Sequence, residues 1–517
     1  MNAKARTGKA RTANLVLAGL LAFVVGFAAG IPSALAADVP PGEALVIHPP
    51  EMSPGVRMLG DIKDPKGYFK PDPNYDHEPY DAEAQLAIYG GKHMNKTADM
   101  PVELGIRLYD RGAYTARPTW LGEQNPIGFH FMAYGDLRVG TAFYDNGIAN
   151  SSGERNQSAL AARLNLDMDL AITATERIHA FVRPLDQNGS FTRYQFNGGE
   201  QQNYVEELDF DFDTLFFEGD LGYIRQGLTG KRTAHDMPIA FGRVPLFTQN
   251  GIWLDDAFDG IAYGITARNI PQLDISNTDV TFFAGFDKVT TAADPGDNTK
   301  VFGLAGFIDA WKGYAEYGYG YVAADNEDLS YHNITAAFSR RYRPTSTIGM
   351  SNSVRLIGNI GQEGPVKTAD GLLLLLENSF HRSDPGFLVP YVNLFAGFNS
   401  PQPLARTADG GGVLKNTGIN FESDGLTGYP TLDARASDSW GFAAGLEKLW
   451  GISQQVVVEG AVVQRMGSSS LGNQYALGVR FQRPLNNAWI FRADTMHGWR
   501  QGQDDVYGVR VELRRKF

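Results

Sequence analysis

The sequence predicts an all-β fold, namely a transmembrane antiparallel β-barrel of about 18–20 strands, with 16–22 possible, short periplasmic turns and long extracellular loops. Three observations favour this fold. Apolar and polar residues alternate along many short segments, the chain is rich in glycine and aromatic residues, and a strand pattern runs to the last residue, Phe517. A bilayer tolerates strands only in a closed sheet, because open edges leave backbone groups without hydrogen bonds.

The C-terminal segment, DDVYGVRVELRRKF, carries the clearest strand pattern. Its apolar side consists of Tyr507, Val509, Val511 and Leu513, followed by Phe517, and its polar side consists of Arg510, Glu512 and Arg514. Terminal residues usually fray unless something holds them. We therefore expect this strand to pair with the first strand and close the barrel. The segment resembles the C-terminal assembly signal of bacterial outer-membrane proteins, which implies recognition by the barrel-assembly machinery.

Four more strands with a period of two precede or adjoin this one, at 439–450, 454–465, 473–483 and 489–496. Short turns join some neighbours, whereas the other connections are longer. Further upstream the same alternation is weaker, with Tyr314–Val322 as its best example. The repetition, more than any single segment, predicts the barrel.

The N-terminus has the three parts of a secretory signal peptide. Four cations (Lys4, Arg6, Lys9 and Arg11) precede an apolar run, and Ala34-Leu35-Ala36 forms a cleavage site, so residues 1–36 are the predicted signal. Residues 37–82 are rich in proline, which excludes sheet interiors and favours a periplasmic or lumenal segment, or a disordered leader. The barrel domain is predicted for 83–517, and the expected location is the cell outer membrane.

Composition excludes several other classes of protein. The chain has no cysteine, which removes thiol catalysis, cysteine-bound zinc and iron–sulfur clusters. The net charge of −12 becomes more negative once the signal peptide leaves, so no nucleic acid partner is expected. No zincin or P-loop motif occurs, and we expect no cofactor and no metal. Scattered histidines at 130, 179, 332 and 497 leave a barrel-embedded hydrolase open as an alternative.

Two segments fall outside the expected wall. Residues 228–258 carry several apolar side chains and suggest an inward loop, although Pro238–Phe247 could instead hide a strand. Residues 399–439 are rich in Gly and Asp without sustained alternation, and we expect a long extracellular loop there.

The stretch from Phe241 to Ile265 resembles alginate-export-type and related substrate-specific porins of Gram-negative bacteria. The matching positions are Gly242, Arg243, Phe258, Asp259 and Gly260, whereas Val244 stands where that family commonly has Gln. The resemblance implies a porin-like barrel with a pore-narrowing segment here. Within that segment, the candidates for a pore constriction are Arg243, Asp255 and Asp256.

Strand parity places a set of charged residues on the lumen face, with acids mainly from N-terminal strands and arginines from C-terminal ones. These lumen-lining candidates are Asp167, Asp169, Asp209, Asp211, Asp213, Arg355, Arg465, Arg480, Arg492 and Arg510. Opposed acidic and basic walls favour hydrated polar solutes, although any polar-lined barrel carries solvated charges.

The leading hypothesis is a porin-like transport channel for small hydrophilic solutes, which is not an enzyme. The alternatives are an export conduit for an extracellular polysaccharide and a barrel-embedded hydrolase. Expected partners are outer-membrane lipid and lipopolysaccharide, the assembly machinery, and small polar solutes or a polysaccharide. A homo-oligomer is also possible.

Overall fold

A computed structural model describes residues 100–105, 118–119, 122–123, 130–149, 153–172, 176–187, 189–196, 203–229, 231, 236–293, 299–345, 348–363, 365–382, 388–407, 410–422, 425–450, 454–467 and 472–517. The expected signal peptide (1–36) and proline-rich segment (37–82) lie outside these residues. Within the described part, helices that are long and apolar enough to cross a membrane are absent.

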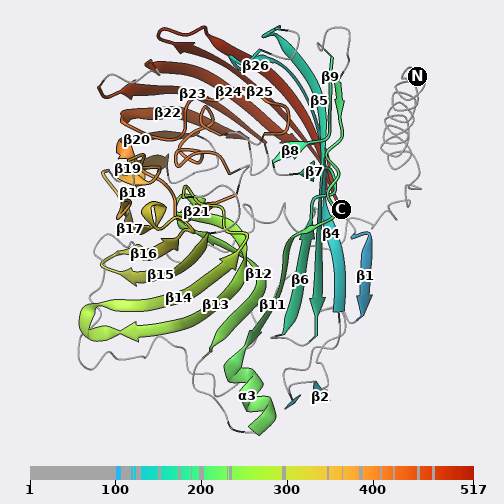
Figure 1. Cartoon of the computed structure of the whole chain (residues 1–517), viewed down its shortest axis with the longest axis vertical. Coiled ribbons are helices and arrows are strands. Elements are labelled where there is room, and N and C mark those ends of the chain that lie inside the picture. Colours follow the sequence, from blue (N-terminus) through green and yellow to red (C-terminus); the bar gives the residue numbers. More distant parts are fainter. Residues whose placement is uncertain are drawn as a thin grey trace. The chain divides into compact units, whose positions relative to one another are not determined.

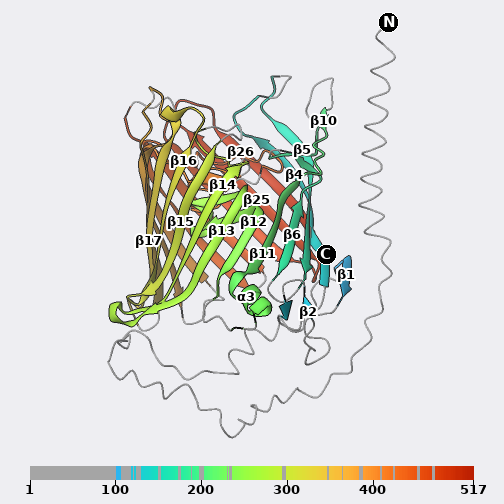
Figure 2. The same cartoon turned by 60° about the horizontal axis from the view of Figure 1, so that its bottom comes forward.

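The described chain forms a closed antiparallel β-barrel with 18 wall strands, which confirms the predicted fold class (Figures 1 and 2). Two wall strands are each interrupted, so that β6 continues as β9 and β10 continues as β11. The strands of the wall are β4 (His130–Asp145), β5 (Gln157–Ala171), β6 (Arg177–Val182), β9 (Arg193–Gln195), β10 (Asn203–Val205), β11 (Phe212–Asp220), β12 (Pro238–Thr248), β13 (Leu254–Ile270), β14 (Ile275–Asp287), β15 (Lys300–Ala310), β16 (Gly313–Ala323), β17 (Tyr331–Tyr342), β18 (Ile348–Ile360), β19 (Asp370–Arg382), β20 (Leu388–Ser400), β22 (Ser439–Trp450), β23 (Gln454–Arg465), β24 (Gln474–Pro484), β25 (Trp489–Arg500) and β26 (Val506–Lys516).

Short elements accompany this wall. The strands among them are β1 (Val102–Gly105), β2 (Pro118–Thr119), β3 (Gly122–Glu123), β7 (Asp186–Gln187), β8 (Ser190–Phe191) and β21 (Ala405–Arg406). The helices are α3 (Leu221–Thr229) and the 3-10 turns η2 (Gln249–Gly251), η3 (Pro271–Leu273) and η4 (Glu327–Leu329).

The barrel closes between the last strand and β4. β26 pairs with β4 from Tyr507 to Lys516, and Phe517 then exchanges two backbone hydrogen bonds with Gly135, of 2.9 and 3.0 Å. β1 pairs with β4 beyond that point, in line with β26. The described wall therefore begins at His130, and residues 83–99, at the start of the predicted barrel domain, lie outside the described residues.

Side chains of the closing strand show which face of the wall is which. Val509, Val511 and Leu513 are exposed on the outside (54%, 37% and 39%), whereas Arg510 and Glu512 are buried inside (3% and 4%). Exposed apolar residues outside and buried charges inside are the reverse of a soluble protein, and they are the pattern that lipid around a polar lumen requires.

The hairpin of β12 and β13 leaves the wall and bends inward. β12 pairs with β11 only as far as Arg243, while its remaining residues pair with β13 alone. Gly242 marks the departure with a φ of 117°, and a Cβ there would lie 2.5 Å from the Leu215 carbonyl oxygen. The structure therefore has the alternative considered for 228–258, a strand at Pro238–Thr248, in place of an irregular loop. The end of the hairpin beyond Arg243 and its tip turn inside.

The connection between β20 and β22 also differs from the prediction. Residues 401–438, called the lumen loop below, begin at the barrel end opposite Phe517 and fold back into the interior instead of projecting outward. Leu404, Leu414, Leu426 and Phe421 are buried to 1% exposure or less. These apolar side chains recur among the glycines and aspartates, and packing them against the inner wall stabilises the inward position.

Candidate functional site

The lumen loop is fixed to the wall by a buried carboxylate. Glu459 on β23 is fully buried and accepts the backbone N–H groups of Ile419 and Asn420, each at 2.9 Å. It also accepts the Asn420 side-chain amide at 2.9 Å and the Tyr391 hydroxyl. One wall side chain therefore satisfies several polar groups of a loop that crosses the interior.

A second attachment is ionic. Glu422 of the lumen loop pairs with Arg480 and Arg492, and both arginines also bind Asp494 on β25, at 2.6 and 2.8 Å. Burial alone would raise the pKa of Glu422, but attraction by Arg480 and Arg492 outweighs burial and holds that pKa below its usual value. Arg510 completes the network by donating to Asp494 at 2.7 Å.

Further along the loop, Asp433 accepts hydrogen bonds from Arg435 and from Arg465 on β23. Burial would raise the pKa of Asp433, but these two arginines lower it overall. The loop is therefore held at several points along its length by charge-assisted bonds.

The tip between β12 and β13, residues Gln249–Trp253, packs against the inner face of the wall at β16–β18. Trp253 is fully buried, and its indole Nε1 donates to the Asn333 Oδ1 of β17 at 2.6 Å. Gln249 Oε1 accepts from Thr335 at 2.8 Å and from Arg355 at 2.6 Å. The tip and the lumen loop meet each other where Arg406 donates to the Gly251 carbonyl oxygen.

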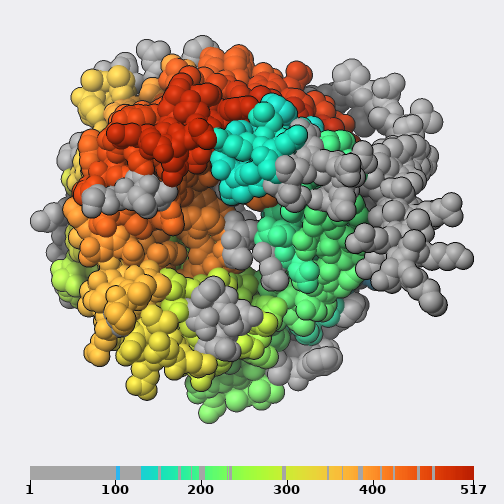
Figure 3. Space-filling view, turned by 45° about the horizontal axis from the view of Figure 1, so that its top comes forward, coloured from blue at the N-terminus to red at the C-terminus, as the bar shows by residue number. Residues whose placement is uncertain are grey.

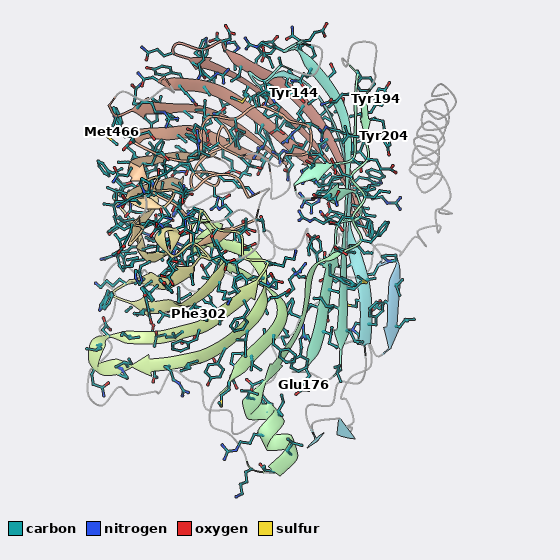
Figure 4. All side chains as sticks on the ribbon, in the orientation of Figure 1. Tyr144, Glu176, Tyr194, Tyr204, Phe302 and Met466 are labelled. Atoms are coloured by element: carbon teal, nitrogen blue, oxygen red, sulfur yellow. The ribbon has the colours of Figure 1, made fainter. Side chains whose placement is uncertain are left out.

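These two insertions leave a cavity of about 1230 Å³ beside them, between the inner faces of β4–β6, β11–β13 and β24–β26. Side chains crowd the interior on the side of β16–β23 (Figure 4), and the space-filling view shows a hollow at the centre (Figure 3). The charged lining residues are Arg138, Arg163, Arg183, Arg243, Arg492, Arg514, Lys288, Lys415, Asp186, Asp209, Asp211, Asp213, Asp255, Asp256, Asp259, Glu422 and Glu512.

The acidic and basic linings are partly separate. Asp209, Asp211 and Asp213 precede or begin β11, and Asp255 and Asp259 lie on β13, so these two neighbouring regions form an acidic side. The arginines come from both ends of the chain, because Arg138, Arg163 and Arg183 lie on or directly after β4, β5 and β6. The expected division into acidic N-terminal and basic C-terminal strands is therefore wrong. Barrel closure places the first and last strands side by side, so their arginines share one face.

All three constriction candidates line this cavity. Arg243 donates to Asp259, which lies directly opposite it on β13, at 3.1 Å. It also donates to the Phe212 carbonyl oxygen at 2.7 Å. Asp256 is 5% exposed and accepts the Thr290 backbone N–H at 2.8 Å, so it fixes the neighbouring loop.

The lumen-lining candidates all lie on interior-facing positions, but they divide into two groups. Those that reach the open cavity or a recess beside it are Asp167, Asp209, Asp211, Asp213 and Arg492. Those that line neither space are Asp169, Arg355, Arg465, Arg480 and Arg510, and each of these is held in an ion pair. Alternation along a strand identifies the residues that face the interior. Only the three-dimensional structure shows which of these side chains the lumen loop and the hairpin tip cover.

Sequence reasoning missed the two carboxylates that hold the lumen loop in place. Glu422 was hidden in a stretch interpreted as an exposed loop, and Glu459 appeared only as one polar residue of a strand. The sequence does contain a signal of burial, namely Leu404, Leu414, Phe421 and other apolar residues of the loop. A loop exposed to solvent would not be expected to contain so many apolar side chains.

The histidines do not form a hydrolytic site among the described residues. His130 faces Glu103 at 3.2 Å, His179 lies near Asp169 and Glu218, and His497 lies 3.5 Å from Asp505. The Ser351 hydroxyl does approach His381, but at 3.5 Å and without a carboxylate on that histidine in the described part, which falls short of a serine–histidine relay. No group of metal-binding side chains occurs within the described residues.

Comparisons with known proteins give structural likeness without sequence likeness. No protein-family model matches the chain, and no curated protein matches it. Solved structures similar to it include Pseudomonas aeruginosa OpdQ, with a TM-score of 0.47 at 10% identity, and P. aeruginosa OpdK with vanillate, with 0.48 at 10%. Acinetobacter baumannii OccAB4 gives 0.46 at 8% identity. Each comparison covers 74% of this chain and 98% of the other.

Proposed function

We propose that this protein is an outer-membrane channel for the passage of small hydrophilic solutes. The observation that carries the proposal is the charged cavity of about 1230 Å³ inside a closed wall whose outer face is apolar. A water-filled space between acidic and basic side chains stabilises polar solutes and offers little to apolar ones. The function involves no catalysis.

The insertions give the channel its selectivity in this proposal. The lumen loop and the tip at Gln249–Trp253 fill one side of the interior, so a solute must pass beside Arg243, Asp255 and the arginines opposite. Arg243 and Asp255 then act at the narrow part of the path, where a fixed charge discriminates best between ions.

The apolar outer face of the wall and the position of the C-terminus give the expected orientation of the protein in the membrane. The exposed Val509, Val511 and Leu513 side chains face outer-membrane lipid, with lipopolysaccharide in the outer leaflet, and the end at Phe517 faces the periplasm. The Phe517 strand serves as the signal for barrel assembly. An export conduit for a polysaccharide remains the second candidate, but it requires a wide lumen, and the lumen loop is fixed across the interior by Glu459 and by the pairs at Glu422.

Planar-bilayer recording on the purified full chain tests the proposal. We expect steady single-channel conductance, and liposomes containing the protein should swell in small sugars but not in large ones. A lumen that passes neither ions nor small sugars would contradict the channel. Swelling that is independent of sugar size would instead favour the wide export conduit.

A further inference from the structure

A second, smaller space opens beside the main cavity. This recess of about 350 Å³ lies against β4, β5, β6, β11 and β12, and its lining includes Tyr134, Asp167, His179, Phe181 and Phe216. Phe181, Thr214 and Pro245 also line the main cavity, so the recess is a side chamber of the lumen.

The recess combines aromatic rings with a carboxylate. In the strand register, Asp167 lies directly between Tyr134 on β4 and Phe181 on β6. Phe216 of β11 adds a third ring, stacked on the His179 imidazole with ring centroids 4.9 Å apart. Rings around a carboxylate form an environment that suits an organic cation, because the ring faces and the carboxylate are both negative.

The charges around the recess do not balance. Arg177 forms ion pairs with two carboxylates, Asp169 at 4.0 Å and Glu218 at 3.9 Å. His179 lies between the same two carboxylates. Asp169 is only 6% exposed, and its buried Oδ1 atom has no hydrogen-bond partner among the described residues. Asp167 has no hydrogen bond or ion pair to any described residue.

We propose that the recess is a binding subsite for an alkylammonium group of a passing solute, with Asp167 as its counter-ion and Tyr134, Phe181 and Phe216 as its walls. Asp167 is half-buried. A partly desolvated carboxylate without a hydrogen-bond partner costs free energy, and a bound cation lowers that cost. This inference rests on the proposed channel. Because Arg183 lines the adjoining cavity, a solute with an ammonium group and a distant anionic group can contact both sides.

Binding of two matched probes to the detergent-solubilised full chain tests the subsite. Butylammonium and butanoate are small aliphatic ions of opposite charge with four carbon atoms each, and titration calorimetry measures the binding of both. We expect wild-type protein to bind butylammonium more tightly than butanoate. Asp167→Asn and Phe216→Leu should each weaken butylammonium binding at least fivefold, whereas Asp504→Asn, at an exposed turn, should not. Unchanged binding in Asp167→Asn would overturn the subsite.

Two controls separate folding from binding, and the subsite from the channel. The Asp167→Asn barrel must keep its heat-modifiability, and Phe216→Leu tests the ring wall without changing charge. A protein that conducts ions but binds butylammonium no better than butanoate refutes the subsite and leaves the channel intact. A protein that binds butylammonium at Asp167 but never conducts supports the subsite and refutes the channel.

Discussion

At the scale of single residues, Arg243 both lines the cavity, as the sequence predicted, and holds two strands together. Its guanidinium lines the cavity, and the same group bonds Asp259 and the Phe212 carbonyl where β12 leaves β11. The side chains of Arg243 and Asp259 are 24% and 43% exposed, so solvent screens the pair, and such pairs contribute about 0–1 kcal/mol. The pair therefore matters more for the field in the lumen than for stability.

We expect Arg243→Ala to shift the channel toward cations, because the substitution leaves Asp259 uncompensated beside the acidic side of the cavity. Reversal potentials in a salt gradient measure the shift, and thermal unfolding should change little. Arg243→Lys keeps the charge and should keep the selectivity. Unaltered reversal potentials in Arg243→Ala, with a large loss of stability, would show that the residue only pins the hairpin.

The sequence was most informative about such residues through parity. Alternation placed Asp167, Asp169 and Arg492 on the interior face, since in a strand the period of two is fixed by geometry. It could not separate Arg492, which reaches the cavity, from Arg510, which lies against Tyr429 of the lumen loop. That difference depends on a contact between segments far apart in the chain.

At the scale of elements, the lumen loop decides how much of the barrel is open. Its composition suggested an exposed loop because glycine and aspartate dominate locally. Its position depends instead on scattered apolar residues and on the wall carboxylate Glu459, and neither has a short-range pattern. The inward tip at Gln249–Trp253 was predicted only roughly for the same reason, since Trp253 binds Asn333, which lies 80 positions away.

We expect Glu459→Ala to release the lumen loop and raise single-channel conductance. The substitution leaves the buried N–H groups of Ile419 and Asn420 without an acceptor, at about 1–3 kcal/mol for each. Glu447→Ala removes a carboxylate from the neighbouring strand β22 and should leave conductance close to wild type. Equal conductance in both variants would mean that Glu459 does not hold the loop.

Acid should loosen the same loop. The pKa values of Glu422 and Asp433 lie below those of free carboxyl groups, so their contribution is complete above the free pKa of about 4 and is lost as pH falls through the lowered values. Because the chain has no cysteine, Asn416→Cys provides a single site for an environment-sensitive dye. We expect its fluorescence to change only below about pH 4.

A dye at Gln503→Cys, in the exposed turn between β25 and β26, provides the control for that measurement. Its signal should stay constant over the range in which the Asn416 label responds. A common transition at both sites would indicate unfolding of the whole barrel, and a transition near neutral pH would contradict the role of the two carboxylates.

At the scale of the whole molecule, closure of the sheet was predictable from one end of the chain. A strand that runs to the last residue must be held on both edges, and β26 pairs with β25 on one edge and β4 on the other. The starting strand was not predictable. β1 and β4 both show short apolar patterns, and only the pairing with β26 identifies β4 as the strand that completes the wall.

Deleting Phe517 should impair assembly more than any change in an exposed turn. Phe517 and Gly135 exchange the last two hydrogen bonds of the closing ladder, so the deletion leaves Gly135 without partners at the seam. Outer-membrane level and heat-modifiability measure the effect, with deletion of Asp504 from the exposed turn at 501–505 as the control. If the chain lacking Phe517 assembled at the normal level, the end of the ladder would not be needed for closure, and the seam would depend on the pairs from Tyr507 to Lys516 alone.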